Sequence, residues 1–154
     1  MSHRNSVMLA LLMISGCKGG LRGSITVEQF QTLGWLEGRW RGSMGQANPF
    51  YESYRFLDDS TLASFSYPDS SFGRAADSSV IELTRGVVLN RGGKSLWRAT
   101  SLDATSIHFE PVTNAANSFT WRRASPTTWT ATLRWRNEQG QEQMRIYQME
   151  KLSP

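Results

Sequence analysis

The sequence predicts an all-β fold, a single antiparallel up-and-down β-barrel of about eight to ten strands with a short N-terminal helix. From Gly38 onward, segments rich in Thr, Tyr, Phe, Trp and Val recur between turn signals, as an all-β domain requires. The segments follow one another without crossover helices, which favours antiparallel neighbours joined in chain order. Closing such a meander into a barrel removes its two exposed edges.

The helix is expected first, within residues 26–36. Apolar side chains stand at positions 27, 30, 33 and 36, a spacing that suits one or two helical turns with one buried face. Thr26 precedes them and is a residue type that caps helix N-termini. The sequence therefore predicts a short amphipathic helix that opens the domain.

The strands come next, and the clearest is 128–136. There Trp129, Ala131, Leu133 and Trp135 alternate with threonines and arginines, the pattern of a half-buried antiparallel strand. Turn residues at 58–60, 90–93 and 138–141 separate neighbouring strands, and 68–78 is expected to be the longest loop. The predicted strands are 38–44, 49–57, 61–67, 79–85, 86–90, 95–101, 105–110, 118–123, 128–136 and 142–152.

The junction of helix and first strand carries the most informative motif. Gly38-Arg39-Trp40 follows the helix; glycine permits a tight turn into the strand, and Trp40 offers a large apolar surface to the end of the barrel. This arrangement resembles the entry to calycin-type barrels, the group of lipocalins, fatty-acid-binding proteins and nitrobindins. The resemblance implies structural roles for Gly38, Trp40 and a late-strand arginine stacked on Trp40, either Arg145 or Arg123.

A longer pattern, covering most of residues 30–152, is similar to an uncharacterised bacterial family of lipocalin-like domains. That family has a His-Asp-Phe-Pro run after Phe-Glu-x-Pro, whereas 112–116 here contains neither histidine nor acid. The resemblance thus implies a barrel and no particular chemistry. Its residues are Leu33, Trp35-Leu36, Gly38, Trp40, Gly42, Phe50-Tyr51-Glu52, Ile81-Glu82-Leu83, Phe109-Glu110-Pro111 and Phe119-Thr120-Trp121-Arg122-Arg123.

The first residues are typical of an export signal. Arg4 precedes the apolar run 7–14, which is too short to span a bilayer but suits a signal-peptide core. Ile14-Ser15-Gly16-Cys17 resembles the bacterial lipobox, which implies cleavage before Cys17 and its acylation. We expect a lipoprotein signal peptide at 1–16, lipidated Cys17 and a flexible tether at 17–24, and the barrel domain at 25–154. The alternative is a buried N-terminal helix with a free cysteine.

Lipidation would account for the single cysteine, since an odd thiol in an exported protein needs an explanation. The mature part has no apolar run long enough to span a membrane, so the lipid on Cys17 would be the anchor. Lys18 follows the cysteine in place of the Asp that retains enteric lipoproteins at the inner membrane. The expected location is the cell envelope, at the periplasmic face of the outer membrane if the host is Gram-negative.

Composition argues against several classes of function. The 17 basic residues are scattered, and only Arg122-Arg123 are adjacent, so we expect no nucleic-acid partner. His108 is the single histidine after the signal, which leaves too few donors for zinc, and 142–152 lacks the histidine that a nitrobindin-like barrel would supply to haem. Neither a Gly-x-Ser-x-Gly elbow nor a phosphate-cradling glycine motif occurs. We expect no metal, no cofactor and no catalytic residue.

The candidate ligand site consists of polar and aromatic strand residues. Glu52, Glu82 and Glu110 each stand beside aromatic or branched apolar residues. A carboxylate on an inward face must be paired or have a raised pKa; the alternative is that these glutamates face water. Glu52 shares a face with Phe50, Tyr54 and Phe56. The candidate ligand-binding residues are Glu52, Tyr54, Glu82, Trp97, Glu110 and Trp121.

The sequence therefore predicts a lipid-anchored barrel that binds a small hydrophobic or amphipathic ligand, such as a lipid. One alternative is a structural or interaction protein of the envelope with a filled barrel, which docks an unknown protein partner through its outer face or the 68–78 loop. Another is an enzyme that uses Glu52 or Glu82 as a general base. A hollow lined by aromatic residues favours ligand binding over the filled barrel.

Overall fold

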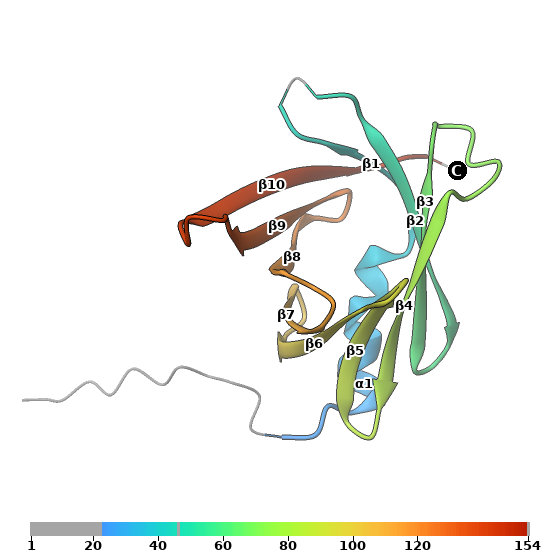
Figure 1. Ribbon diagram of the computed structural model, residues 1–154. Coiled ribbons are helices and arrows are strands. Elements are labelled where there is room, and N and C mark those ends of the chain that lie inside the picture. The colour runs from blue at the N-terminus through green and yellow to red at the C-terminus, as the bar shows by residue number, and fades with distance from the viewer. Residues whose placement is uncertain (1–22, 46, 154) are drawn as a thin grey trace, which may run out of the picture.

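The computed structural model describes residues 23–45 and 47–153, which form a closed barrel of ten antiparallel strands with one short helical segment (Figure 1). The expected signal peptide, Cys17 and most of the tether lie outside the described residues. The strands are β1 (Gly38–Ser43), β2 (Phe50–Asp58), β3 (Thr61–Tyr67), β4 (Asp77–Thr84), β5 (Val87–Gly92), β6 (Ser95–Leu102), β7 (Ser106–Thr113), β8 (Asn117–Ser125), β9 (Thr128–Arg136) and β10 (Glu142–Lys151).

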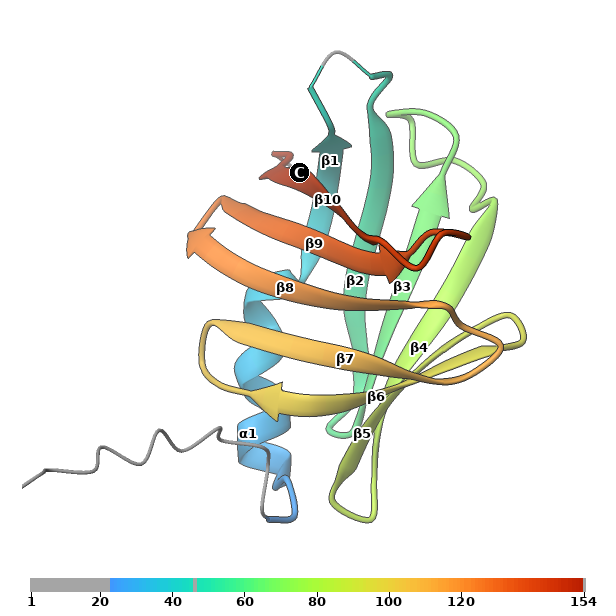
Figure 2. The ribbon, with the colours of Figure 1, turned by 60° about the vertical axis from the view of Figure 1, so that its left-hand side comes forward.

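The strands pair in chain order, and β1 closes the barrel by pairing with β10. Figure 2 shows β6 to β9 running across β1 to β4 at a steep angle, as the strand tilt of a small barrel requires. The predicted fold class, a single antiparallel up-and-down barrel with a short N-terminal helix, is confirmed. The longest connection between these strands is the segment between β3 and β4, as the sequence predicts.

The helical segment consists of α1 (Val27–Gln31) followed by a 3-10 turn, η1 (Thr32–Leu36). Thr26 caps α1 in a reciprocal pair of hydrogen bonds: the backbone N–H of Gln29 donates to Thr26 Oγ1 at 3.3 Å, and the backbone N–H of Thr26 donates to Gln29 Oε1 at 2.9 Å. Such a capping box satisfies two otherwise unpaired N–H groups. None of the helices among the described residues is long and apolar enough to cross a membrane.

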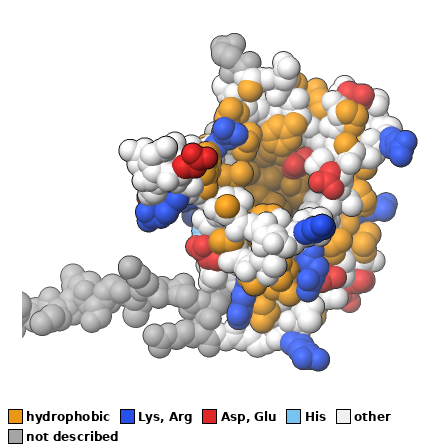
Figure 3. All heavy atoms as spheres, viewed as in Figure 1, with side chains coloured by type: hydrophobic (Ala, Val, Ile, Leu, Met, Phe, Trp, Pro, Cys, Tyr) orange, Lys and Arg blue, Asp and Glu red, His pale blue; other side chains and the backbone are white. Residues whose placement is uncertain are grey.

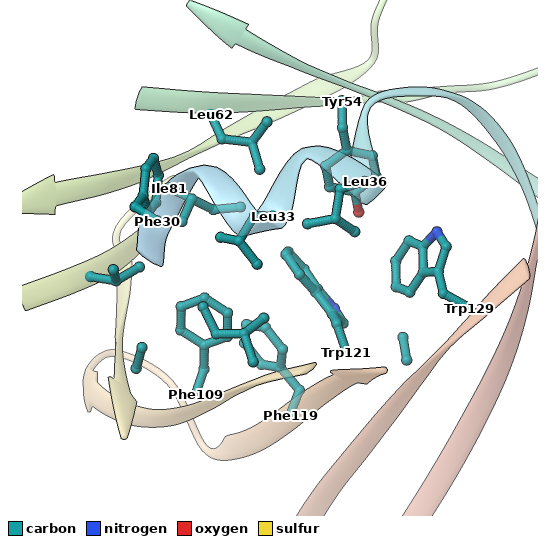
Figure 4. Packing of buried hydrophobic residues seen from close by; sticks show 14 of the residues in the cluster. Phe30, Leu33, Leu36, Tyr54, Leu62, Ile81, Phe109, Phe119, Trp121 and Trp129 are labelled. Carbon is teal, nitrogen blue, oxygen red and sulfur yellow. The ribbon is translucent and has the colours of Figure 1, made fainter. Parts of the chain in front are cut away.

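The helical segment closes one end of the barrel. Phe30, Leu33 and Leu36 are fully buried, and they point from the helix into the cluster formed by the strands (Figure 4). Phe30 packs edge-on against Phe56 of β2, with ring centroids 5.8 Å apart. The helix therefore fills the end of the barrel where β2 finishes, and strand side chains line the end where β2 begins.

The Gly38-Arg39-Trp40 junction has the expected geometry. Gly38 adopts φ of 124°, a conformation that favours glycine, and Trp40 is buried with its indole N–H donating to the carbonyl of Leu36 at 2.6 Å. The prediction that an arginine stacks on Trp40 is wrong. Lys151 lies there, its Nζ 5.3 Å from the ring centroid, because it pairs with Trp40 in the strand register.

Neither candidate arginine is placed to stack on Trp40. Arg145 pairs with Leu133, nearer the other end of β10, and its guanidinium lies over the Trp135 ring at 5.6 Å. Arg123 donates instead to the carbonyl of Ser125 at 3.3 Å. Arg145 therefore does not have the predicted structural role of stacking on Trp40, and it lies instead at the open end of the barrel.

Candidate functional site

A cavity of about 310 Å³ opens at the end of the barrel away from the helix. Figure 3 shows a hollow there lined with hydrophobic side chains, between β10 on one side and β2 to β4 on the other, as placed in Figure 1. We call this cavity the cup. It is lined by Phe50, Glu52 and Tyr54 of β2, Trp121 of β8, Trp129, Ala131 and Leu133 of β9, and Tyr147 and Met149 of β10.

Alternation along three strands builds the cup. Residues i and i+2 of a strand share a face, so the inward faces of β2, β9 and β10 each contribute two or three lining residues. The register places them together: Ala131 pairs with Tyr147 on one side and with Trp121 on the other. Segments far apart in the sequence thus meet around one hollow because the barrel closes.

Aromatic rings form the deep part of the cup. Trp121, Trp129 and Tyr54 pack edge-on against one another, with centroid distances of 5.7 to 5.9 Å, and Figure 4 shows them beside the buried helix. Nearer the mouth, Phe50 packs edge-on against Tyr147 at 5.3 Å. Edge-to-face pairs of this kind contribute about 0.5–1.5 kcal/mol each beyond their buried area, so the rings that form the apolar wall of the cup stabilise one another.

One carboxylate enters this apolar surface. Glu52 Oε2 accepts a hydrogen bond from the Tyr54 hydroxyl at 2.6 Å. Burial raises the pKa of the Glu52 carboxyl above its ordinary value, and the hydrogen bond from Tyr54 partly opposes this. Burial, together with the neighbouring Glu52, raises the pKa of Tyr54 well above its ordinary value, so Tyr54 keeps its proton and remains the donor of this pair.

The mouth of the cup carries a cationic side chain. Arg145 donates from Nη1 to the Tyr147 hydroxyl at 3.3 Å while its guanidinium lies over Trp135. Arg145 is exposed and does not line the cup. The site therefore combines an aromatic interior, one half-buried carboxylate and an exposed guanidinium at the rim.

Three of the sequence-predicted ligand residues, Glu52, Tyr54 and Trp121, come together in the cup. The expected inward position of Glu82 is wrong. Ile81 takes the inward position on β4 and is fully buried, so Glu82 points outward and pairs with Arg91 Nε at 3.0 Å.

The inward position expected for Glu110 is also wrong, because Phe109 faces the core and turns Glu110 to the outer surface. Its carboxylate lies 2.8 Å from His108 Nε2, and His108 also contacts Thr120 Oγ1 at 2.7 Å. Trp97 faces inward but does not line the cup. It packs against Phe119 at 5.6 Å and donates its indole N–H to the carbonyl of Asn117 at 2.8 Å.

The structure adds lining residues that the site prediction did not include. Phe50 lies beside Glu52 on the inward face of β2, and Tyr147 lies beside Arg145 on the inward face of β10. Ala131, Leu133 and Met149 complete the wall together with Trp129, a strand tryptophan of the kind that the sequence predicts for a cavity lining. Phe50 carried a signal in its alternation with Glu52, and Leu133 in its alternation with Trp129. Tyr147 carried a weaker one, because β10 alternates apolar and polar residues less regularly.

Groups of three or more His, Cys, Asp or Glu side chains that could hold a metal ion do not occur within the described ranges. No family model matches the sequence. No curated protein is significantly similar to it.

Several solved structures have similar barrels. A redesigned beta barrel is 11% identical, with a TM-score of 0.41, over 80% of this chain and 96% of that one. Rv2717c from M. tuberculosis is 13% identical, with a TM-score of 0.47, over 81% and 98%. EF1p2_mFAP2b bound to DFHBI is 8% identical, with a TM-score of 0.42, over 79% and 98%.

Proposed function

We propose that the barrel binds a small hydrophobic or amphipathic molecule in the cup. The observation that carries the proposal is the open cavity of about 310 Å³, lined by aromatic rings with one carboxylate among them. Small-molecule sites are typically concave, mostly apolar and supplied with a few polar groups that fix orientation. The helix fills the other end of the barrel, so the interior is neither hollow throughout nor packed throughout.

A substitution that fills the cup tests this proposal. Ala131 stands in the wall, nearly buried, between Trp129 and Leu133, so Ala131→Phe should place a ring in the cavity. We expect the affinity for the neutral apolar dye N-phenyl-1-naphthylamine, measured by its fluorescence enhancement, to fall by about tenfold or more. A loss of about 1.4 kcal/mol of binding free energy is sufficient for that change.

The matched control is Thr132→Phe, one residue along the same strand and on the outer face. Thr132 pairs with Thr120 and Ile146, whose side chains also face outward. This variant should bind the dye as the wild type does. Equal dye binding by wild type and Ala131→Phe, with both folded by circular dichroism, would contradict a ligand site in the cup.

We also propose that the protein is held at the cell envelope by a lipid on Cys17. Support comes from the sequence: an apolar run after Arg4, small residues at 15 and 16, and a single cysteine directly after them. A tether to residue 24 would then join the lipid to the barrel. The diacylglyceryl group that a lipobox implies on the cysteine thiol carries two acyl chains, and two chains anchor a protein stably where one does not.

Metabolic labelling tests the anchor. The full chain expressed in a bacterium fed an alkyne-tagged fatty acid should acquire the tag and partition into the detergent phase of a Triton X-114 extract. The Cys17→Ser variant should carry no tag and should retain the signal peptide, residues 1–16. Labelling that survives Cys17→Ser would place the lipid elsewhere, and absence of labelling in the wild type would refute the anchor.

A further inference from the structure

The cup holds an acidic group without a cationic partner. Among the described residues, acidic side chains lie within 4.0 Å of basic ones in four pairs, one of them His108 with Glu110, and Glu52 is in none of these pairs. The hydrogen bond that reaches its carboxylate comes from the neutral hydroxyl of Tyr54. A carboxylate placed among apolar side chains is costly unless a donor or a cation compensates it. A cationic ligand bound in the cup would supply such compensation to the ionised carboxylate.

The aromatic rings around the carboxylate favour the same kind of molecule. Trp121 and Trp129 line the cup from β8 and β9, and Phe50 and Tyr147 line it from the mouth side. The face of an aromatic ring attracts a cation, most strongly for tryptophan. The apolar part of a ligand would pack on the same rings, so one set of side chains serves both parts of an amphipathic cation.

An anionic ligand is less well matched. The cation at the mouth is Arg145, which is exposed, already lies over Trp135, and does not line the cavity. A carboxylate ligand that reached Arg145 would remain in water at the rim, where ion pairs are weak. A carboxylate inside the cup would instead face the like charge of Glu52.

We propose, building on the proposed function of the cup, that its ligand is an organic amine: the ammonium group binds the Glu52 carboxylate and the apolar body lies against the tryptophans. The inference adds the chemical class of the polar head to the small apolar ligand already proposed. Tyr54 holds one oxygen of Glu52 through its hydroxyl, which leaves the other oxygen for the ligand. Charge-assisted hydrogen bonds of this kind are stronger than neutral ones.

Three probes of the same length test the proposal: 4-phenylbutylamine, 4-phenylbutan-1-ol and 4-phenylbutanoate. Each is titrated calorimetrically into the full chain carrying Cys17→Ser, so that acylation is absent from all samples alike. We expect the amine to bind about tenfold or more tightly than the alcohol, and the carboxylate to bind most weakly. Glu52→Gln should reduce the affinity for the amine to that for the alcohol.

The matched control is Glu82→Gln, the same change on the outer face, where Glu82 pairs with Arg91. It should leave all three affinities unchanged. The alcohol also reports the state of the cup, because it should bind wild type and Glu52→Gln equally. If Glu52→Gln failed to bind the alcohol, Glu52→Asp, which keeps the charge, should still bind the amine more tightly than the alcohol. Loss of that preference in Glu52→Asp would overturn the inference.

The outcomes separate the two proposals. If the alcohol binds but the amine binds no tighter, the inference about the amine is wrong and the ligand cup stands. If the carboxylate binds best and Arg145→Gln removes its advantage, the rim guanidinium selects an anion and the inference is again wrong. If none of the probes binds to the wild type, the proposed function fails, and the inference fails with it.

The pH dependence provides a second measurement. Binding of the ammonium requires ionised Glu52, so amine affinity should fall as the pH falls through the pKa of Glu52, which burial raises. The titratable or charged groups around it are Tyr54 on β2, Tyr147 and the rim Arg145 on β10, and two exposed groups two strands away in the register. These two are Asp77, reached through Ser66, and Lys151, reached through Trp40. Glu52→Gln should remove this decline, and a decline that persists in Glu52→Gln would contradict the assignment.

Discussion

Replacing Trp129 by alanine should lower the free energy of unfolding by about 3–5 kcal/mol, the range measured for removing a large aromatic side chain from a core. Trp129 is 1% exposed. It packs edge-on against Trp35 of the helical segment, Trp40 of β1 and Tyr54 of β2, with centroids 5.9 Å away in each case. Its removal therefore opens a void between the helix and three strands.

Urea denaturation followed by far-UV circular dichroism measures this loss. Because small domains are stable by only about 5–15 kcal/mol, Trp129→Ala should move the midpoint markedly toward lower urea. Trp135→Ala is the control on the same strand: Trp135 is half-buried and lies under the exposed Arg145, so its loss leaves a surface hollow. Equal destabilisation by the two variants would contradict the central position of Trp129.

Replacing Phe30 by alanine should also cost about 3–5 kcal/mol, through the closed end of the barrel. Phe30 is fully buried and packs against Phe56 of β2. The helix contains only five residues before its 3-10 turn, and helices of this length are stabilised by tertiary packing rather than by intrinsic propensity. Loss of the Phe30 side chain should therefore release the helix as well as leave a void.

Amide hydrogen exchange distinguishes release of the helix from a local void. Protection should fall across residues 27–36 in Phe30→Ala, and the midpoint of urea unfolding should decrease. Val27 on the same helix is 41% exposed, so Val27→Ala should leave exchange in 27–36 and the midpoint nearly unchanged. If Phe30→Ala kept the amide protection of residues 27–36, packing of the Phe30 side chain would not be what stabilises the helix, and the prediction would be contradicted.

The fold could be predicted from the sequence because its signals are local. Period-two alternation, as in 128–136, specifies a half-buried strand, and turn residues such as Asn90 to Gly93 specify where the chain reverses. The helix start follows from Thr26 and the apolar spacing after it. Pairing in chain order then requires little further information, since each strand has its nearest partner next in sequence.

The candidate site could be predicted only in part. Alternation assigns Glu52 to the inward face through Phe50 and Tyr54. The same rule places Glu82 outside, because Ile81 and Leu83 on either side of it are inward-facing, and apolar neighbours alone were a misleading signal. Glu82 is on the face of β4 away from these core residues, where its carboxylate pairs with Arg91 at the surface.

The depth of the cup lies beyond such rules. It depends on how far the helix reaches into the barrel and on which side chains from β2, β8, β9 and β10 meet at one level. Those distances arise from strand tilt and closure, which couple residues more than 60 positions apart, such as Tyr54 and Trp121. A sequence pattern of period two contains no measure of that offset.

The chain enters the barrel beside the β4–β5 turn, where the Ile25 N–H donates to the Gly86 carbonyl at 2.9 Å. This turn is at the helix end, opposite the mouth of the cup. The eight residues from Cys17 to Ser24 are joined by seven peptide steps and can extend roughly 25 Å at most, so the acylated Cys17 proposed above would hold the closed end within that distance of the bilayer. If both proposals hold, the mouth lies at the end of the barrel away from the attachment point, where a ligand of the cup would exchange with solutes or soluble donors of the aqueous compartment.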